Sequence, residues 1–239
     1  MRYLIKFSYD GTKFHGFQRQ NNVKNVQGLL ETVLSNYLKE TIVIKGAGRT
    51  DAGVHAVCQC AHFYTNKILT KKDIKLINDK LNGDIIINNL KEVPDTFHAR
   101  YSVLEKTYLY KINVGKYDKE KDGYYYQIKY DLDIKLMQEA CKVFIGTHDF
   151  HNFVSGKRDD YTSTIFNIKL KKKKDIILIE FIGIGFYRYM VRHLVGAILD
   201  VGKKRVSIDT LRDMLDNPSV DKQLSVAPSE GLYLIKIKY

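Results

Sequence analysis

Four stretches in the first hundred residues alternate between apolar and polar side chains, and two others repeat apolar side chains every three or four positions. The alternating stretches, whose period of two is typical of strands, are residues 2–10, 40–46, 54–65 and 84–93. The helical stretches are residues 26–40 and 71–82, and the second follows Thr70, which with Asp73 resembles a capping box. We therefore predict the order β-α-β-β-α-β, the split motif of a ferredoxin-like unit.

The rest of the chain repeats this alternation of strands and helices with insertions. Strands are predicted at residues 105–115, 163–171, 175–183 and 231–239, and a strand or an extension of one at 124–130. Helices are predicted at 133–146, 185–202 and 207–215. The run Lys171–Lys174 falls at a hairpin turn and is interpreted as a solvated turn. We predict an α+β protein of two ferredoxin-like (βαββαβ-type) units, residues 1–100 and 101–239, with a largely antiparallel sheet and helices packed on one face.

Composition narrows the class of protein. With 239 residues, 44% of them apolar, the chain can bury a substantial core. Its net charge of +12 favours a polyanionic partner, although a lysine-rich composition weakens that inference. Three cysteines without a signal peptide argue against a disulfide framework. The most apolar run, residues 175–186, is interrupted by Glu180 and is too short to span a bilayer, so we expect a soluble, cytoplasmic protein without a membrane partner.

The stretch GAGRTDAGVHA, residues 46–56, concentrates small residues around one acid. It is not a dinucleotide-binding loop, because Asp51 stands where the third glycine would be and a strand follows. The neighbouring Arg49 favours an ionised Asp51, and an ionised carboxylate can act as a nucleophile or base. The local alternative is an Asx-turn, in which the Asp51 side chain caps its own loop.

Six motifs in order give the chain a family resemblance. They are YDGTKFHGFQRQ, NVQGLLE, GAGRTDAGVHAVCQCAHF, FHARYSV followed by KTYLY, FYRYMVRHLVGAILDVG, and APSEGLYLIKIKY. Together they resemble the motifs of the TruA family of tRNA pseudouridine synthases. The resemblance implies a pseudouridine-synthase fold and the isomerisation of uridine to pseudouridine in RNA, without cofactor or metal.

The resemblance also implies the catalytic residues. Asp51 matches the family's nucleophile, which attacks either C6 of the base or C1′ of the sugar. Tyr108 matches the active-site tyrosine, which stacks on the flipped uracil and assists proton movement at C5. Arg192 matches an arginine that pairs with the aspartate. In the predicted helix this arginine would be buried, and a buried arginine needs a partner.

Further residues are candidates for contact with RNA. They are Arg49, Arg19, Gln20, His55, Phe97, His98, Arg100 and Arg188, together with Tyr108. Arg49 is expected to reach a phosphate or sugar near the flipped nucleotide. Arg188 lies one turn before Arg192 in the predicted helix, on the same face. For His55 we favour a hydrogen bond that braces the loop over a role in the chemistry.

A metal site is the weaker interpretation of one further pattern. Cys58, Cys60 and His62 share one face of a predicted strand, and Cys141 or His55 could supply a fourth ligand. Buried cysteines usually behave as small hydrophobic residues, so we predict no metal.

The resemblance implies tRNA as the RNA partner, with target uridines in the anticodon stem-loop (positions 38–40), and a homodimeric enzyme. Several positions depart from the family motifs without touching the three catalytic candidates. They are Phe17 for Trp, Cys58 for Gly, Thr164 for Pro, Phe166 for Arg and His193 for Asn. These departures leave open a paralogue that modifies ribosomal RNA, and a non-catalytic RNA-binding or chaperoning module is a more remote alternative.

Overall fold

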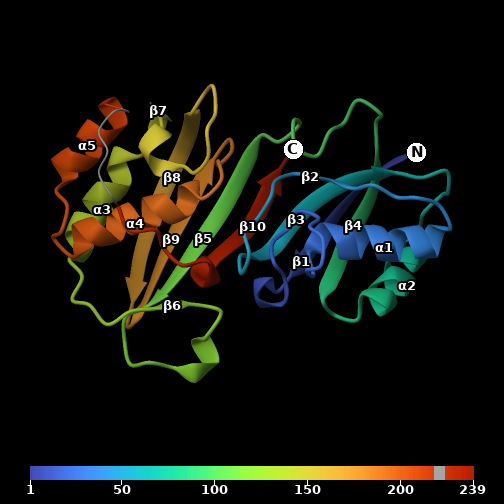
Figure 1. Ribbon diagram of the computed structural model, residues 1–239, viewed down its shortest axis with the longest axis horizontal. Coiled ribbons are helices and arrows are strands. Elements are labelled where there is room, and N and C mark those ends of the chain that lie inside the picture. The colour runs from blue at the N-terminus through green and yellow to red at the C-terminus, as the bar shows by residue number, and fades with distance from the viewer. Residues whose placement is uncertain (218–223) are drawn as a thin grey trace. The chain divides into compact units, whose positions relative to one another are not determined.

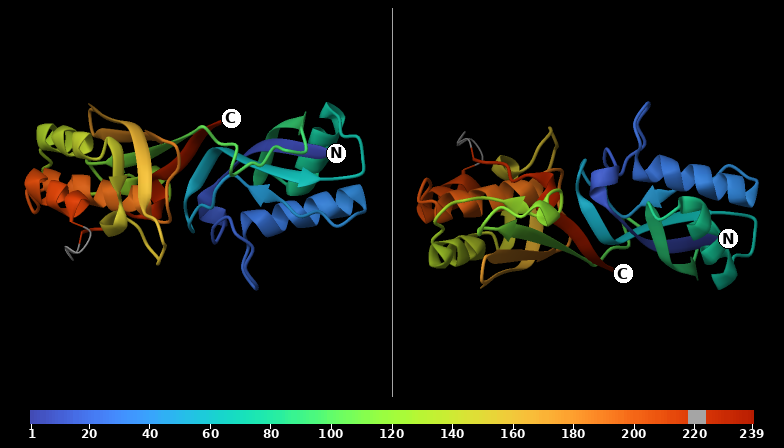
Figure 2. Two further views of the ribbon diagram at one scale, coloured as in Figure 1. Left: turned by 90° about the horizontal axis from the view of Figure 1, so that it is seen from above. Right: turned by 90° about the horizontal axis from the view of Figure 1, so that it is seen from below.

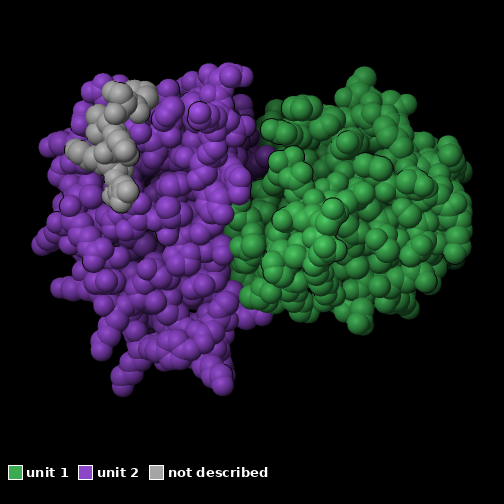
Figure 3. Space-filling view, viewed as in Figure 1, with its two compact units in different colours: residues 1–104, 233–239 green, residues 105–232 purple. Residues whose placement is uncertain are grey.

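The computed structural model describes residues 1–217 and 224–239, which form two compact units (Figure 3). The first unit comprises residues 1–104 and 233–239, and the second comprises residues 105–232. From the sequence, the last strand is predicted to belong to the second unit. In the structure this strand belongs to the first unit, where it pairs with a strand from the middle of that unit.

The first unit contains the predicted β-α-β-β-α-β order, completed by the last strand of the chain (Figure 1). Its elements are β1 (Arg2–Tyr9), α1 (Val26–Leu38), β2 (Lys45–Gly46), β3 (His55–Tyr64), α2 (Lys71–Leu81), β4 (Ile85–Val93) and β10 (Leu232–Lys238). Strand β1 lies between β4 and β3 and is antiparallel to both. Strand β3 also pairs with β2, antiparallel, and with β10, parallel.

Capping side chains mark where the two helices of this unit begin, and a change in backbone conformation marks where α1 ends. Asn25 caps α1 by accepting a hydrogen bond from Gly28 N at 2.8 Å, and α1 ends at Lys39 in the left-handed conformation. The predicted capping box of Thr70 and Asp73 is confirmed at the start of α2. Helix α2 packs against α1 and β4.

The strand predicted at residues 40–46 is wrong except at Lys45–Gly46. Ile42 and Ile44 are buried, which produces the alternating pattern that the prediction used. Their amides, however, donate to side chains of α1 rather than to a neighbouring strand. Ile42 N bonds Ser35 Oγ at 2.9 Å, and Ile44 N bonds a carboxylate oxygen of Glu31 at 3.0 Å.

In the described part of the second unit, residues 105–217 and 224–232, lie a mostly antiparallel set of strands and the three α-helices α3, α4 and α5. Its elements are β5 (Glu105–Asn113), β6 (Tyr126–Gln127), α3 (Ile134–Val143), β7 (Gly146–Asp149), β8 (Thr162–Lys173), β9 (Ile176–Gly183), α4 (Met190–Gly202) and α5 (Ile208–Asp216). The strands are ordered β6-β5-β9-β8-β7, with only β6 parallel to its neighbour among the described residues. Helix α3 packs against α4, α5 and β8, and α3 and α4 lie side by side in both views of Figure 2.

Three predictions in this unit need correction. The helix predicted from residue 185 begins at Met190, because Tyr189 has a left-handed backbone (φ 62°) that a helix interior does not allow. Strand β8 continues through Lys173, so the hairpin turn is at Lys174 (φ 52°) and not over the whole lysine run. Strand β7 was missed, because its sequence, GTHD, has no apolar alternation.

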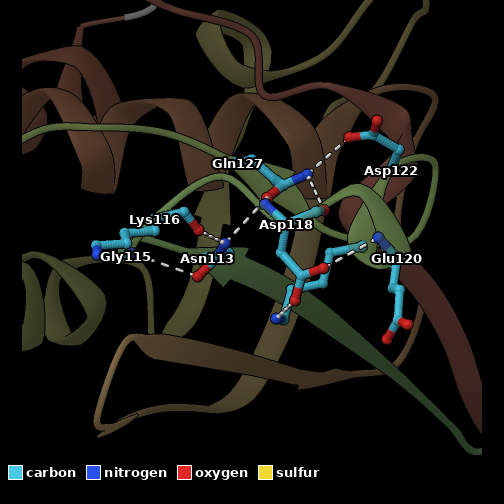
Figure 4. Close-up of polar contacts among 8 residues, drawn as sticks. Asn113, Gly115, Lys116, Asp118, Glu120, Asp122 and Gln127 are labelled. Carbon is cyan, nitrogen blue, oxygen red and sulfur yellow. Dashed lines mark hydrogen bonds and ion pairs between the residues drawn. The ribbon is translucent and has the colours of Figure 1, made fainter.

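The connection from β5 to β6 is organised by one amide side chain (Figure 4). Gln127 accepts hydrogen bonds from Asn113 Nδ2 and Asp118 N, and donates to Asp118 O and Asp122 Oδ1. All four distances lie between 2.7 and 3.0 Å.

Over the two described ranges, the protein has the predicted α+β fold class. No helix in these ranges is long and apolar enough to cross a membrane.

Candidate active site

Asp51 lies in the loop between β2 and β3 and is half-buried. Val54 N donates to the main-chain oxygen of Asp51 at 3.1 Å, and Gly53 adopts φ 80°, the positive value that a type II turn requires at its third position. The backbone oxygen therefore closes this turn. The Asx-turn interpretation, in which the carboxylate would close it, is not needed to explain the loop.

The segment that follows β1 lies against the backbone of the Asp51 loop. A Cβ at Gly11 would lie 2.4 Å from Val54 O, and a Cβ at Gly16 (φ 92°) would lie 3.0 Å from Thr50 O. Phe17 N donates to Thr50 O at 3.0 Å. These contacts explain the glycines of the YDGTKFHGF motif, because any side chain there would push the two segments apart.

Gly46 has a similar role on the loop side. A Cβ at Gly46 would lie 2.5 Å from the ring of Phe17, so the glycine makes room for an aromatic side chain of the same chain. Phe17 itself is buried. The absence of a side chain at Gly46 therefore allows the Phe17 ring to pack within the first unit.

His55 lies at the C-terminal end of the loop, where it is the first residue of β3. It is buried, and its Nδ1 accepts a hydrogen bond from Gly11 N at 3.1 Å. Its ring stacks on Tyr233 of β10, with 4.4 Å between ring centroids and 13° between planes. The Nδ1 atom also lies 3.4 Å from Asp10 Oδ1.

A buried hydrogen bond holds the residue directly before Asp51. Tyr9 Oη and Thr50 Oγ1 are 2.8 Å apart. Burial raises the pKa of Tyr9 to about 12, although the hydrogen bond with Thr50 acts in the opposite direction. The Tyr9 hydroxyl thus keeps its proton at any physiological pH. Arg49, on the other side of Thr50, is exposed.

Arg19 and Gln20, both predicted to contact RNA, make contacts within the first unit. The Arg19 guanidinium forms an ion pair with the buried carboxylate of Glu31, and Arg19 N bonds Gln27 Oε1 at 3.1 Å. Gln20 Nε2 donates to His15 O at 2.9 Å. Glu31 was not identified from the sequence, because a glutamate at helical spacing normally faces solvent.

The segment from Phe97 to Arg100 contacts β3 and the C-terminal Tyr239, which follows β10. Ala99 N donates to His62 Nδ1 at 3.1 Å, and the Phe97 ring packs edge-on against Tyr239 with 4.9 Å between centroids. Burial lowers the pKa of His62 to about 4 and also lowers the pKa of His98. Arg100 is exposed.

The cysteine pattern on β3 is explained by contacts within the first unit. Cys58 and Cys60 hydrogen-bond each other, which lowers the pKa of Cys58 and raises that of Cys60. The Nδ1 of His62 is taken by Ala99. Within residues 1–217 and 224–239, no group of three or more His, Cys, Asp or Glu side chains could hold a metal ion.

Tyr108, in the second unit, lies in the middle of β5 opposite Phe181 of β9. Its side chain is largely buried, and its ring contacts Phe186 edge-to-face, with 5.3 Å between centroids and 83° between planes. A Cβ at Gly183 would lie 3.1 Å from the Phe186 ring, so this glycine leaves room for the aromatic pair.

Arg192 lies in the first turn of α4 and is half-buried, not fully buried as predicted. Its Nε donates to Ala227 O at 2.7 Å, and Ala227 N donates to Arg192 O at 3.1 Å. The guanidinium carbon also lies 4.5 Å from the centroid of the Tyr189 ring. The contact with Ala227 therefore links the motif containing Arg192 to the motif APSEGL.

The backbone around Ser225 lies directly on α4. A Cβ at Gly196 would lie 1.6 Å from Ser225 O. The buried carboxylate of Asp200 accepts hydrogen bonds from Ser225 N and Ser225 Oγ, both at 2.9 Å. Gly196 and Asp200 thus fix Ser225, two residues before Ala227, whose carbonyl oxygen accepts the hydrogen bond from Arg192.

Arg188 does not lie on the helix face predicted for it. It precedes the first residue of α4, is exposed, and its guanidinium carbon lies 5.3 Å from the Tyr189 ring centroid. The left-handed Tyr189 separates it from the helix that holds Arg192.

Comparison with known proteins identifies the family. The family described as tRNA pseudouridine synthase matches residues 5–102 and 140–239. The chain belongs to this family. Its tRNA pseudouridine synthase A relatives include those of Malacoplasma penetrans, 38% identical with 100% of both chains covered, and Thermosipho africanus, 39% identical with 100% of this chain and 99% of the relative covered. The relative from Geobacillus sp. is 40% identical, with 100% of this chain and 98% of the relative covered.

The TruA resemblance is therefore confirmed, and the protein is by family a tRNA pseudouridine synthase, an isomerase. A crystal structure of the archaeal box H/ACA sRNP Nop10–Cbf5 complex aligns with a TM-score of 0.38 and 12% identity, over 84% of this chain and 44% of that chain. This likeness is too slight to support any argument. Asp51 and Arg192 fall inside the matched residues, and Tyr108 falls between the two matched ranges.

Proposed function

We propose that this tRNA pseudouridine synthase isomerises uridine to pseudouridine in the anticodon stem-loop of tRNA, at positions 38–40, with Asp51 as the nucleophile. The observation that carries the proposal is Asp51 itself. It is a half-buried acid on a loop that neighbouring backbone holds on both sides, in a chain that resembles tRNA pseudouridine synthases A along its full length. We further propose that the chain consists of two ferredoxin-like units with helices packed on one face, as expected for a pseudouridine-synthase fold.

The chemistry needs a carboxylate but no cofactor. The ionised Asp51 adds to C6 of the base or to C1′ of the sugar, and the C1′–N1 bond breaks. The uracil then turns, and its C5 forms a new bond to C1′. The C5 proton is lost, N1 gains a proton, and Asp51 leaves as a carboxylate, so that the product is an isomer of the substrate.

The other candidates have supporting roles in this proposal. Tyr108 stacks on the flipped uracil and moves the C5 proton. Arg192 keeps Asp51 ionised, because a neighbouring cation favours the charged form of a carboxylate. The pairing of Arg192 with Asp51, which the resemblance implies, stays a prediction. The exposed Arg49 and Arg100 contact RNA phosphates.

Release of tritium from tRNA labelled with 5-³H-uridine tests the activity, because the C5 hydrogen is lost only when C5 bonds to the sugar. We expect release in the presence of EDTA. Asp51→Asn should reduce release to background while tRNA binding persists, since the amide has the same shape and no charge. Asp95→Asn, at an exposed site, is the matched control. Normal turnover by Asp51→Asn would contradict the mechanism.

Site-specific mapping of pseudouridine in total RNA, from cells with and without the protein, tests the substrate. Loss of the modification at tRNA positions 38–40 is expected. Loss in ribosomal RNA instead would favour the paralogue, and an unchanged map would favour a non-catalytic RNA-binding module. A cytoplasmic homodimer is part of the same proposal, and light scattering of the purified protein tests the dimer.

A further inference from the structure

Asp51 follows a residue whose side chain is held from inside the first unit. Thr50 is buried, with 8% of its surface exposed, and its hydroxyl is 2.8 Å from Tyr9 Oη. Tyr9 is the last residue of β1 and is 7% exposed. A buried hydroxyl pair of this kind is stronger and more directional than one in water.

A second buried side chain holds the backbone near the start of the loop. Gln59 is fully buried in β3, and its Nε2 donates to Gly48 O at 3.2 Å. Its Oε1 accepts from Cys60 N at 3.1 Å. The side chains of Tyr9 and Gln59 therefore hold the backbone at residues 48 and 50, just before the aspartate.

We propose that Tyr9 is a positioning residue for Asp51: its hydroxyl fixes Thr50, and through Thr50 the direction in which the Asp51 carboxylate leaves the loop. This inference rests on the proposed role of Asp51 as nucleophile. A nucleophile displaced by about 1 Å can lose on the order of a hundredfold in rate, so a small shift at Thr50 suffices. Tyr9 does not touch the substrate in this proposal.

The test uses Tyr9→Phe, with Tyr3→Phe as the matched control. Both tyrosines lie in β1 and are buried, and the Tyr3 hydroxyl accepts a hydrogen bond from Leu69 N at 3.1 Å, away from the Asp51 loop. Both variants lose a buried, hydrogen-bonded hydroxyl and should lose similar thermal stability. Only Tyr9→Phe should lower kcat for tritium release, by about tenfold to a hundredfold, with KM within about twofold of the unmodified protein.

Thr50 provides a second pair of variants. Thr50→Val keeps the shape but removes the hydroxyl, whereas Thr50→Ser keeps the hydroxyl. We expect kcat to fall in Thr50→Val and to be largely retained in Thr50→Ser. The double variant Tyr9→Phe/Thr50→Val should be no slower than Thr50→Val alone, because both changes remove the same interaction. Additive losses would contradict the proposal, as would equal kcat in the two tyrosine variants.

Amide hydrogen exchange separates this inference from the proposed activity. The amides of Phe17 and Val54 donate to the main-chain oxygens of Thr50 and Asp51. In Tyr9→Phe these two amides should exchange faster than in the unmodified protein, and in Tyr3→Phe their exchange rates should be unchanged. Both results are expected whether or not the protein releases tritium. Unchanged exchange in Tyr9→Phe would overturn the positioning role. Absence of tritium release in the unmodified protein would instead overturn the proposed function.

Discussion

Arg192 and Ala227 are joined by two hydrogen bonds that run in opposite directions. The Arg192 side chain donates to Ala227 O at 2.7 Å, and Ala227 N donates to Arg192 O at 3.1 Å. This pair of bonds fixes the orientation of the guanidinium plane before any RNA is bound. It also explains why the motifs MVRHLVG and APSEGL occur together although they are far apart in the chain.

Replacement of Arg192 by lysine should impair catalysis while keeping the positive charge. A lysine ammonium cannot bond Ala227 O and also present a planar pair of donors to a carboxylate. We expect kcat/KM for tritium release to fall at least about tenfold, equivalent to about 1.4 kcal/mol. The control is Arg212→Lys, in which the replaced arginine is largely exposed on α5. Equal activity in the two variants would contradict an orienting role for Arg192.

Gly196→Ala should destabilise the second unit. The added methyl group would lie 1.6 Å from Ser225 O, so the helix or the peptide across it must move. Overpacking of this kind typically costs about 1–3 kcal/mol. Urea unfolding measures the loss, and Gly185→Ala, where no atom lies within 4 Å of the added methyl group, is the control. A difference below about 0.5 kcal/mol between the free energies of unfolding of the two variants would show that the structure accommodates the added methyl group at little cost.

Acid should destabilise the first unit through His62. Burial lowers the pKa of His62 from 6.5 to about 4, so between these values the unfolded chain binds more protons than the folded one. The free energy of unfolding therefore carries no penalty from His62 above pH 6.5, and it falls by up to about 3 kcal/mol as the pH drops to 4. The lowered pKa of His98 acts in the same direction.

His62→Gln tests this pH dependence, since glutamine keeps a hydrogen-bond acceptor and does not titrate. Urea unfolding at pH 7.5 and pH 5 should show a smaller loss of stability in His62→Gln than in the unmodified protein. His151→Gln, at an exposed position, should leave the loss unchanged. The same pH dependence in all three proteins would mean that other groups cause it.

Tyr108→Phe should separate stacking from proton transfer. The phenylalanine ring can keep the edge-to-face contact with Phe186, whereas the hydroxyl is lost. We expect tRNA affinity to change less than twofold and kcat to fall about a hundredfold, within the range that general acid–base groups contribute. Tyr117→Phe removes an exposed hydroxyl that bonds Asp122 and serves as the control. Full activity in Tyr108→Phe would restrict Tyr108 to packing.

The sequence predicted most helices and strands because their burial pattern is periodic. The predictions were wrong where the apolar pattern did not match the conformation or the hydrogen-bond partners of the backbone. Residues 41–44 alternate like a strand, yet their amides bond Ser35 and Glu31, and no pattern of apolar residues reports such a partner. Tyr189 belongs to an apolar run that looks helical, yet its positive φ delays the helix to Met190.

The candidate site was predicted by motif resemblance more than by local chemistry. The residues around Asp51 predicted an ionised carboxylate, with an Asx-turn as the alternative, but they gave no sign of the contacts made nearby. The space at Gly46 holds the ring of Phe17, and Arg19 pairs with Glu31. Such contacts join residues distant in sequence, so one sequence without its fold gives no sign of them.

The position of β10 has a consequence for biosynthesis. The ring of Tyr233 stacks on His55, and its strand pairs with β3, so the first unit contains a part that is translated last. A ribosome that has made residues 1–104 has made nearly all of this unit but not the strand beside β3. The loop that carries Asp51 therefore gains its aromatic support only after the second unit has been synthesised. Termination of translation between Arg192 and Tyr233 would leave a chain that contains every catalytic candidate but lacks the ring that stacks on His55.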